Sequence, residues 1–194
     1  MVFLVVGLGN PGLRYANSRH NAGFMVVEKV AEKTGIGISG KQFDGECGSG
    51  FCGETKLILF KPQTFMNNSG EPVRKIMGFY GLNTDAAVVA HDEVDLPVGR
   101  IQVKTGGGSA GHNGVKSVAG KIGSGFARLR VGVGRPPAGV DTADYVLSGF
   151  TREETGAVED SVSRAADAVI EMASKGVESV MNRYNTNQKQ HNGG

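Results

Sequence analysis

The sequence contains no tryptophan, only two cysteines, no long apolar run and almost no net charge. Its 21 basic and 19 acidic residues leave a net charge of +2, so any binding of nucleic acid must come from local clusters of Lys and Arg. No segment approaches the roughly 18 apolar residues of a membrane-spanning helix, and Gly7 and Pro11 break up the first apolar run, which argues against a signal peptide. We therefore expect a cytoplasmic protein with no membrane partner. We expect Cys47 and Cys52 to be reduced thiols rather than metal ligands.

Glycine is abundant instead, at 31 of the 194 residues, and it separates short apolar runs from segments of helical periodicity. Apolar runs and alternating patterns predict strands at residues 2–6, 86–90, 100–104 and 128–133, and a hairpin within 43–60 around the segment GSG. Helical patterns occupy residues 21–34, 69–80, 115–122, 151–173 and 175–184. This order predicts a single α/β domain over residues 1–187, with a twisted, mostly parallel (mixed) β-sheet flanked by helices, and a flexible tail at 188–194.

The segment GLGNPG at residues 7–12 matches the G-x-G-x-x-G pattern of dinucleotide-binding proteins. That function requires a helix directly after the third glycine and an acidic residue about 20 positions further on, at the end of the next strand. Here a polar loop of about ten residues follows, and Glu28 lies within the predicted helix. A nicotinamide-dependent reductase is therefore disfavoured. The loop does place Asn10, His20 and other polar residues after the end of a strand, where α/β proteins bind their ligands.

A second polar group follows the apolar run 86–90, where three carboxylates occur within four residues. Glu93 and Asp95 are expected to form a solvated acidic turn. Asp92 is nearest to the strand end and best placed to face a cleft. If Asp92 pairs with His20, the carboxylate would orient the imidazole and make it a general base. Periodicity alone leaves that pairing open.

Two further loops offer side chains for a cleft, although each also has an ordinary structural explanation. In KPQTFMNNSG, Phe65 and Met66 would serve equally well as core residues, and Asn67 as a turn residue. In GHNG, Asn113 could simply cap a helix. The segment GGSAG matches the G-x-S-x-G pattern around a catalytic serine, Ser109, but a suitably placed histidine does not follow it. A serine esterase using Ser109 and a non-catalytic RNA-binding module remain the alternative functions.

Taken together and in order, four segments resemble the bacterial peptidyl-tRNA hydrolase family over residues 2 to about 150. They are VVGLGNPGLRYANSRHNAGF, KPQTFMNNSG, AHDEVDLPVGRIQVKTGGGSAGHNG and ARLRVGVGRP. The resemblance implies hydrolysis of the ester bond between the peptide and tRNA in peptidyl-tRNA, with release of free tRNA and an N-substituted amino acid or peptide. It also implies catalysis by water that a histidine activates, with no cofactor or metal. We expect a monomer.

The resemblance also assigns roles to individual residues. His20 is the general base, Asp92 orients it, and Asn10 helps to discriminate peptidyl-tRNA from free aminoacyl-tRNA. Contacts with the substrate fall on Tyr15, Phe65, Asn67 and Asn113, while Met66 and His112 line the cleft. Candidate contacts with tRNA phosphates are Lys104, Arg128 and Arg130, together with Lys116, Lys121 and Arg135. Gln102 stands where some relatives carry a lysine, which thins this basic cluster. Its residues could equally form a scattered, solvated face.

Overall fold

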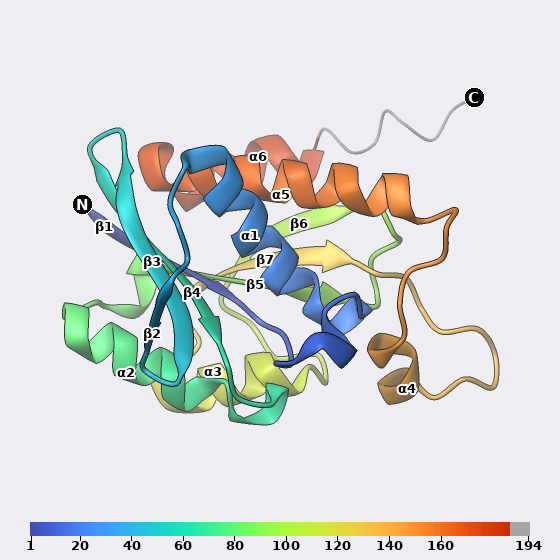
Figure 1. Ribbon diagram of the computed structural model, residues 1–194. Helices are drawn as coiled ribbons and strands as arrows, with labels where there is room; N and C mark the ends of the chain where they lie inside the picture. The colour runs from blue at the N-terminus through green and yellow to red at the C-terminus, as the bar shows by residue number, and fades with distance from the viewer. Residues whose placement is uncertain (187–194) are drawn as a thin grey trace.

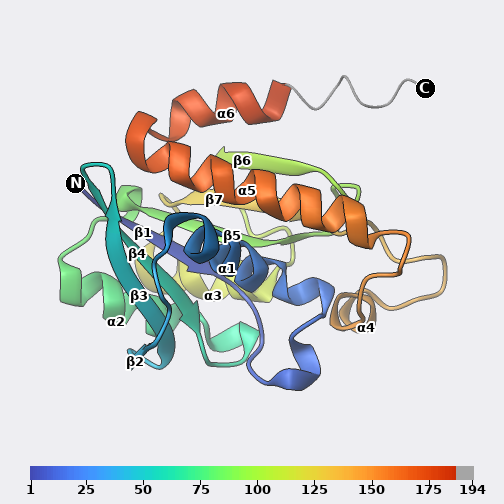
Figure 2. The ribbon, with the colours of Figure 1, turned by 45° about the horizontal axis from the view of Figure 1, so that its top comes forward.

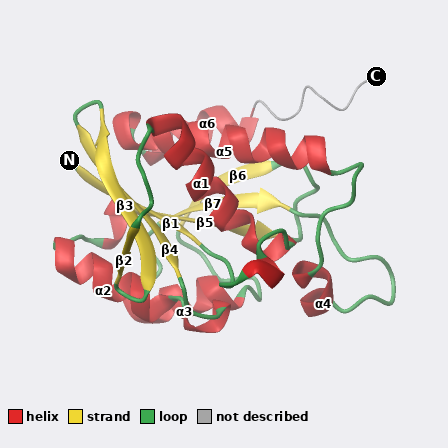
Figure 3. Ribbon diagram, viewed as in Figure 1, coloured by secondary structure: helices red, strands yellow, loops and turns green. Residues whose placement is uncertain are grey.

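The computed structural model describes residues 1–186, and the flexible tail predicted at 188–194 lies outside the described residues. Seven strands form one mixed sheet in the order β2-β3-β4-β1-β5-β7-β6 (Figures 1 and 3). The strands are β1 (Val2–Gly7), β2 (Gly40–Gln42), β3 (Gly45–Cys52), β4 (Thr55–Pro62), β5 (Ala87–Glu93), β6 (Ile101–Thr105) and β7 (Ala127–Gly132). The predicted α/β fold with a mixed sheet is confirmed.

The four central strands are parallel and the edge strands are antiparallel. β1 pairs in parallel with β4 on one side and with β5 on the other, and β5 pairs in parallel with β7. β3 and β6 run antiparallel to their neighbours. Because the chain leaves β1 toward β4 and later returns to its other side as β5, the ends of β1 and β5 form a topological switch point, where open α/β sheets place their binding sites.

Helices cover both faces of the sheet (Figures 1 and 2). On one face α1 (Ala22–Thr34), α5 (Thr155–Lys175) and α6 (Val177–Thr186) enclose a core centred on Val5, Val88 and Leu129. On the other face α2 (Gly70–Tyr80) and α3 (Asn113–Ile122) enclose a core around Leu4 and Phe60. The short helix α4 (Thr142–Leu147) lies beyond the end of β7, away from both layers (Figure 1).

Helix α1 packs unusually close to the sheet. A Cβ atom added to Gly23 would lie 2.3 Å from the carbonyl oxygen of Ala90 and 2.4 Å from the backbone nitrogen of Leu8. The first turn of α1 therefore contacts the backbone of β5 and of the residues that follow β1. This approach also brings the loop that precedes α1 to the ends of both strands.

The structure differs from the predicted elements in several places. β5 continues to Glu93, so Asp92 is the penultimate residue of the strand and does not follow it. The predicted hairpin is β3–β4, with GSG inside β3 and the turn at residues 53–54. The helix expected from Thr151 begins at Thr155, and α4 was not predicted. No helix within residues 1–186 is both long and apolar enough to span a membrane.

Candidate active site

The loop after β1 carries the first group of polar residues to the switch point. It contains two short 3₁₀ segments, η1 (Leu13–Tyr15) and η2 (Arg19–Asn21), before α1 begins at Ala22. Gly7 of β1 pairs with Ala90 of β5, so the residues that follow the two positions lie at the same edge of the sheet. Asn10 from the loop and Asp92 from β5 are thereby brought to one place, and both are buried.

Asp92 lies between two imidazole rings. Nδ1 of His20 is 2.9 Å from each of the two carboxylate oxygens of Asp92. Nε2 of His112 is 2.8 Å from Oδ1 of the same carboxylate. The two rings have centroids 5.0 Å apart. The pairing that the sequence left open is therefore present, and His112 joins it as a second partner.

The surrounding hydrogen bonds fix the protons of this group. His112 is the N-cap of α3, and its Nδ1 accepts a hydrogen bond from the backbone N–H of Val115 at 3.2 Å. Nδ1 is then unprotonated, so the proton of neutral His112 is on Nε2 and is donated to Asp92. Burial alone would raise the pKa of Asp92, but the electrostatic interaction and hydrogen bond with His112, and then those with His20, lower it below the ordinary value. The ionised carboxylate accepts the Nδ1 proton of His20.

As a result, Nε2 of His20 is left as the unprotonated nitrogen of its ring. It makes no hydrogen bond to any residue from 1 to 186, and His20 lines a cavity. A basic nitrogen that faces a cavity, on a ring held by a carboxylate, is the arrangement of a general base.

Asn10 is held in one orientation by contacts on both its backbone and its side chain. Its backbone N–H donates to Oδ1 of Asn21, and its carbonyl accepts from Nδ2 of Asn21, each at 2.9 Å. Its side-chain oxygen accepts from the backbone N–H of Met66 at 2.8 Å. An N–H donor at Oδ1 settles which end of the amide is which, so the end without a partner among residues 1–186 is the side-chain NH₂ group.

The cavity of about 450 Å³ has a polar end and an apolar wall. Its polar end contains Asn10, His20, Asp92, Glu93, His112 and Asn113. Its wall is formed mainly by Val94 and by residues of α4, namely Thr142, Ala143, Val146 and Leu147, and Ala110 and Gly111 complete the lining. Asn113 is the first residue of α3 and is exposed, and the N-cap is His112, so the simple capping role considered for Asn113 is wrong.

Comparison with known proteins identifies the family. The sequence profile of the family described as peptidyl-tRNA hydrolase matches residues 4–192. The chain belongs to this family. The peptidyl-tRNA hydrolase of Geotalea daltonii is 46% identical over 185 residues, which are 95% of this chain and 96% of that protein. That of Bacillus subtilis is 42% identical over 185 residues, which are 95% of this chain and 98% of that protein. The solved structure of peptidyl-tRNA hydrolase from Acinetobacter baumannii is similar with a TM-score of 0.90 at 38% identity, over 95% of each chain.

Other residues that the family resemblance singled out lie outside the cavity lining. Met66 is buried beside Asn10, to which its N–H donates. Phe65 is 59% exposed, Asn67 is exposed and Tyr15 is half-buried. Ser109 is half-buried and is likewise not among the residues that line the cavity. The structure therefore brings together Asn10, His20, Asp92, His112 and Asn113 in the cavity lining, and Tyr15, Phe65 and Asn67 are not among the lining residues.

The basic residues of the hydrolase divide into paired and exposed groups. Arg128 is 4% exposed, and its guanidinium donates to the carbonyl oxygens of Gly107 and Gly108. Arg130 pairs with Glu93 and donates to Gln102. Glu93 is only 6% exposed, so the prediction that it is a solvated turn residue is wrong.

Four basic residues of the predicted cluster have exposed side chains: Lys104, Lys116, Lys121 and Arg135. Of these, Arg135 pairs with Asp95, whose side chain is 51% exposed, as expected. Nζ of Lys121 lies 3.4 Å from Oε2 of Glu71. The exposed side chains of this group, Lys104 among them, are the ones available to an outside anion.

Two histidines and an aspartate with converging ligand atoms could in principle hold a metal ion. The ligand atoms of His20, Asp92 and His112 all lie within 4.8 Å of one another. However, a metal on Nε2 of neutral His112 would require a proton on Nδ1, and Nδ1 accepts the N–H of Val115. The cap of α3 therefore favours a proton rather than a metal on Nε2.

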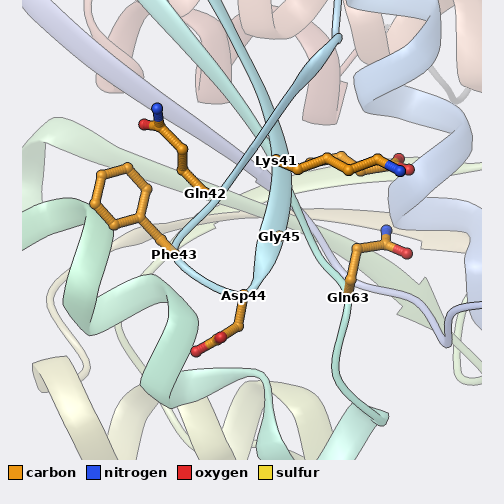
Figure 4. Close-up of a pocket in the computed structure, with 7 residues that line it drawn as sticks. Lys41, Gln42, Phe43, Asp44, Gly45 and Gln63 are labelled. Atoms are coloured by element: carbon orange, nitrogen blue, oxygen red, sulfur yellow. The ribbon is translucent and has the colours of Figure 1, made fainter.

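A second hollow, of about 520 Å³, lies at the turn between β2 and β3 (Figure 4). It is lined by Lys41, Gln42, Phe43, Asp44, Gly45, Glu46 and Gln63. The two acidic side chains have cationic partners, since Asp44 pairs with Lys75 and Glu46 with Lys61. Both carboxylates are therefore paired, and the lining residues include no histidine, so this hollow lacks the imidazole base of the His20 cavity.

Sequence reasoning missed two contributors to the site region. Helix α4 supplies much of the cavity wall, and its only signal was Asp141, whose carboxylate caps it. The second contributor is Arg19 of the loop after β1, which is 4% exposed and whose guanidinium makes several contacts inside the protein. No residue pattern distinguishes a buried arginine from an exposed one.

Proposed function

We propose that the protein hydrolyses the ester bond of peptidyl-tRNA by means of a water molecule that His20 activates. The observation that carries this proposal is the hydrogen bond from Nδ1 of His20 to Asp92, which leaves Nε2 as a base in the cavity. Family membership supports the reaction and the substrate. We also propose that it acts as a cytoplasmic monomer.

In the proposed mechanism, Nε2 of His20 takes a proton from water as the oxygen attacks the acyl carbon. The imidazolium that forms is stabilised by the carboxylate of Asp92, which stays ionised because its pKa is lowered. The tetrahedral intermediate then expels the terminal ribose oxygen of the tRNA, which takes the proton back from Nε2. Free tRNA and a peptide with a new carboxylic acid group leave, the acid then loses its proton to solvent, and the base is restored.

His112 cannot easily take the place of His20 as the base. Its Nδ1 is occupied by the N–H of Val115 and its Nε2 carries the proton that bonds Asp92. Protonation of Nδ1 would break the cap of α3. We propose that His112 holds one oxygen of Asp92 and so keeps the carboxylate in the orientation in which it accepts the hydrogen bond from Nδ1 of His20.

Asn10 can distinguish the two kinds of substrate by the polarity of its free end. Because Oδ1 is taken by Met66, Asn10 presents only N–H donors to the cavity. A peptide carbonyl accepts such a bond, whereas the free ammonium of aminoacyl-tRNA carries only donors and meets no acceptor. Asn113, in the same lining, is a donor for the developing oxyanion.

The proposal is tested with purified protein on N-acetylated and free aminoacyl-tRNA, with Ser109→Ala in parallel. We expect release of the N-acetylated amino acid, little release of the free amino acid, and an unchanged rate in Ser109→Ala. Loss of turnover in Ser109→Ala would favour a serine esterase. Absence of turnover in the wild type would leave only the RNA-binding alternative.

A further inference from the structure

A buried arginine stands next to the proposed base. Arg19 precedes His20 in η2 and is 4% exposed. Its guanidinium forms a two-pronged ion pair with Glu154, with distances of 3.1 Å to Oε1 and 2.7 Å to Oε2. It also donates to the carbonyl oxygen of Val133, directly after β7, at 3.2 Å. The mechanism proposed above gives this residue no part.

The same guanidinium lies over two aromatic rings. Its central carbon is 4.4 Å from the ring centroid of Tyr145 in α4 and 4.9 Å from that of Phe150 in the link between α4 and α5. Tyr145 donates its hydroxyl to the carbonyl of Val133, which also accepts from Arg19. A planar guanidinium can stack on aromatic rings and form a two-pronged ion pair at the same time, whereas a lysine ammonium group cannot. Lysine could therefore not replace the contacts that Arg19 makes.

The backbone of η2 is joined to the same link. The N–H of Arg19 donates to the carbonyl of Ser148 at 2.9 Å, and Ser18 forms an isolated bridge with Gly149. At the other end of η2, Asn21 is bonded to Asn10. His20 therefore lies between two anchors, namely the contacts of Arg19 with the link between α4 and α5 and the contacts of Asn21 with Asn10. A three-residue 3₁₀ segment is not stable alone, so these anchors decide where His20 stands.

We propose that Arg19, held by Glu154, Tyr145 and Phe150, is a positioning residue that sets His20 against Asp92 and at the same time holds α4 against the cavity. This inference rests on the proposed function. Arg19 acts through His20 and through α4, whose Val146 and Leu147 line the cavity. One side chain thereby couples the position of the base to the apolar wall that receives the substrate.

The test combines kinetics with an NMR measurement that has an internal reference. The ring N–H protons of His20 and His112 both donate to Asp92, but only His20 lies on η2. In Arg19→Gln and Arg19→Lys we expect the His20 ring N–H signal to broaden or vanish while that of His112 remains. We expect kcat to fall by about 10–100-fold, which is the effect of displacing a catalytic group by about 1 Å. We expect KM to rise, because α4 is held less firmly against the cavity. Glu154→Gln should act in the same direction more weakly.

Arg74→Gln is the matched control, since Arg74 forms a similar two-pronged pair with Glu71 on the surface of α2. It should change neither kcat nor the ring signals. Retention of both ring signals and of kcat in Arg19→Gln would overturn the proposal. So would loss of both signals together, because that indicates a general structural role. Absence of hydrolysis in the wild type with selective loss of the His20 signal would instead refute the proposed function and leave the positioning intact.

Discussion

At the scale of single residues, the hydrogen bonds distinguish two histidines that share one carboxylate. Val115 donates to Nδ1 of His112, which fixes the proton of that ring on Nε2. No residue from 1 to 186 donates to Nε2 of His20, and His20 lines the cavity. The different roles proposed for the two rings therefore do not follow from exposure, since the side chains are 13% and 9% exposed. These roles follow from which ring nitrogen already accepts a hydrogen bond from the backbone.

Asn10→Asp should change the substrate preference. A carboxylate can still accept the N–H of Met66 with one oxygen, and its other oxygen then presents an acceptor to the cavity where Asn10 presents a donor. We expect kcat/KM for N-acetylated aminoacyl-tRNA to fall and the ratio of free to N-acetylated substrate hydrolysis to rise. Parallel hydrolysis assays on both substrates measure this ratio. An unchanged ratio would show that Asn10 does not distinguish a free amino group from an acylated one.

His91 should make the stability depend on pH. Burial first, and the neighbouring His112 second, lower the pKa of His91 from 6.5 to about 3. Below pH 6.5 His91 binds a proton in the unfolded chain but stays neutral in the folded protein. The contribution of His91 to the free energy of unfolding is therefore complete above pH 6.5 and is lost as the pH falls toward 3. Urea unfolding at a series of pH values should show a steeper loss in the wild type than in His91→Asn. Equal slopes would contradict the assignment.

At the scale of elements, the long periodic segments were predictable and the short ones were not. Helix α1 showed an apolar stripe and ended at Gly35, as the structure confirms. Helix α4 has six residues, too few for a stripe to repeat, and only its capping Asp141 marked it. The end of β5 was misjudged because His91, Asp92 and Glu93 are polar, and the partners that bury Asp92 and Glu93, such as His112 and Arg130, come from distant segments.

The close packing of α1 can be tested at Gly23. Because an added Cβ would lie 2.3 Å from the oxygen of Ala90, Gly23→Ala should lower the free energy of unfolding by ~1–3 kcal/mol and reduce activity, since η2 moves with α1. Gly78→Ala in α2 is the control, because nothing lies within 4 Å of its added Cβ, and alanine there should stabilise by up to ~1 kcal/mol. Chemical denaturation measures both. Equal effects at the two positions would refute the steric account.

At the scale of the whole molecule, parallel strand order brings the site together. The sequence predicted that Asn10, His20 and Asp92 follow or end buried strands, and the ends of such strands meet at a switch point. It could not predict which basic residues stay exposed. That depends on tertiary partners, such as the carbonyls that hold Arg128 and the carboxylate that holds Arg130.

Lys104 and Arg128 face each other across β6 and β7 and form a matched pair for a salt titration. We expect Lys104→Gln, at an exposed position, to reduce the slope of log KM against log salt for the tRNA substrate by about 1 for one lost phosphate contact. Arg128→Gln should leave that slope unchanged and lower the melting temperature, because it frees the loop carbonyls of Gly107 and Gly108. The reverse pattern would show that Arg128 contacts phosphate.

The most direct test of the account is the single-turnover rate of N-acetylated aminoacyl-tRNA hydrolysis in His20→Asn beside the wild type. Asparagine keeps a donor for Asp92 and removes the nitrogen that would take the proton from water. We expect the rate to fall by about 10²–10⁴-fold, the usual contribution of a general base, while the protein stays folded. A rate close to that of the wild type would contradict it.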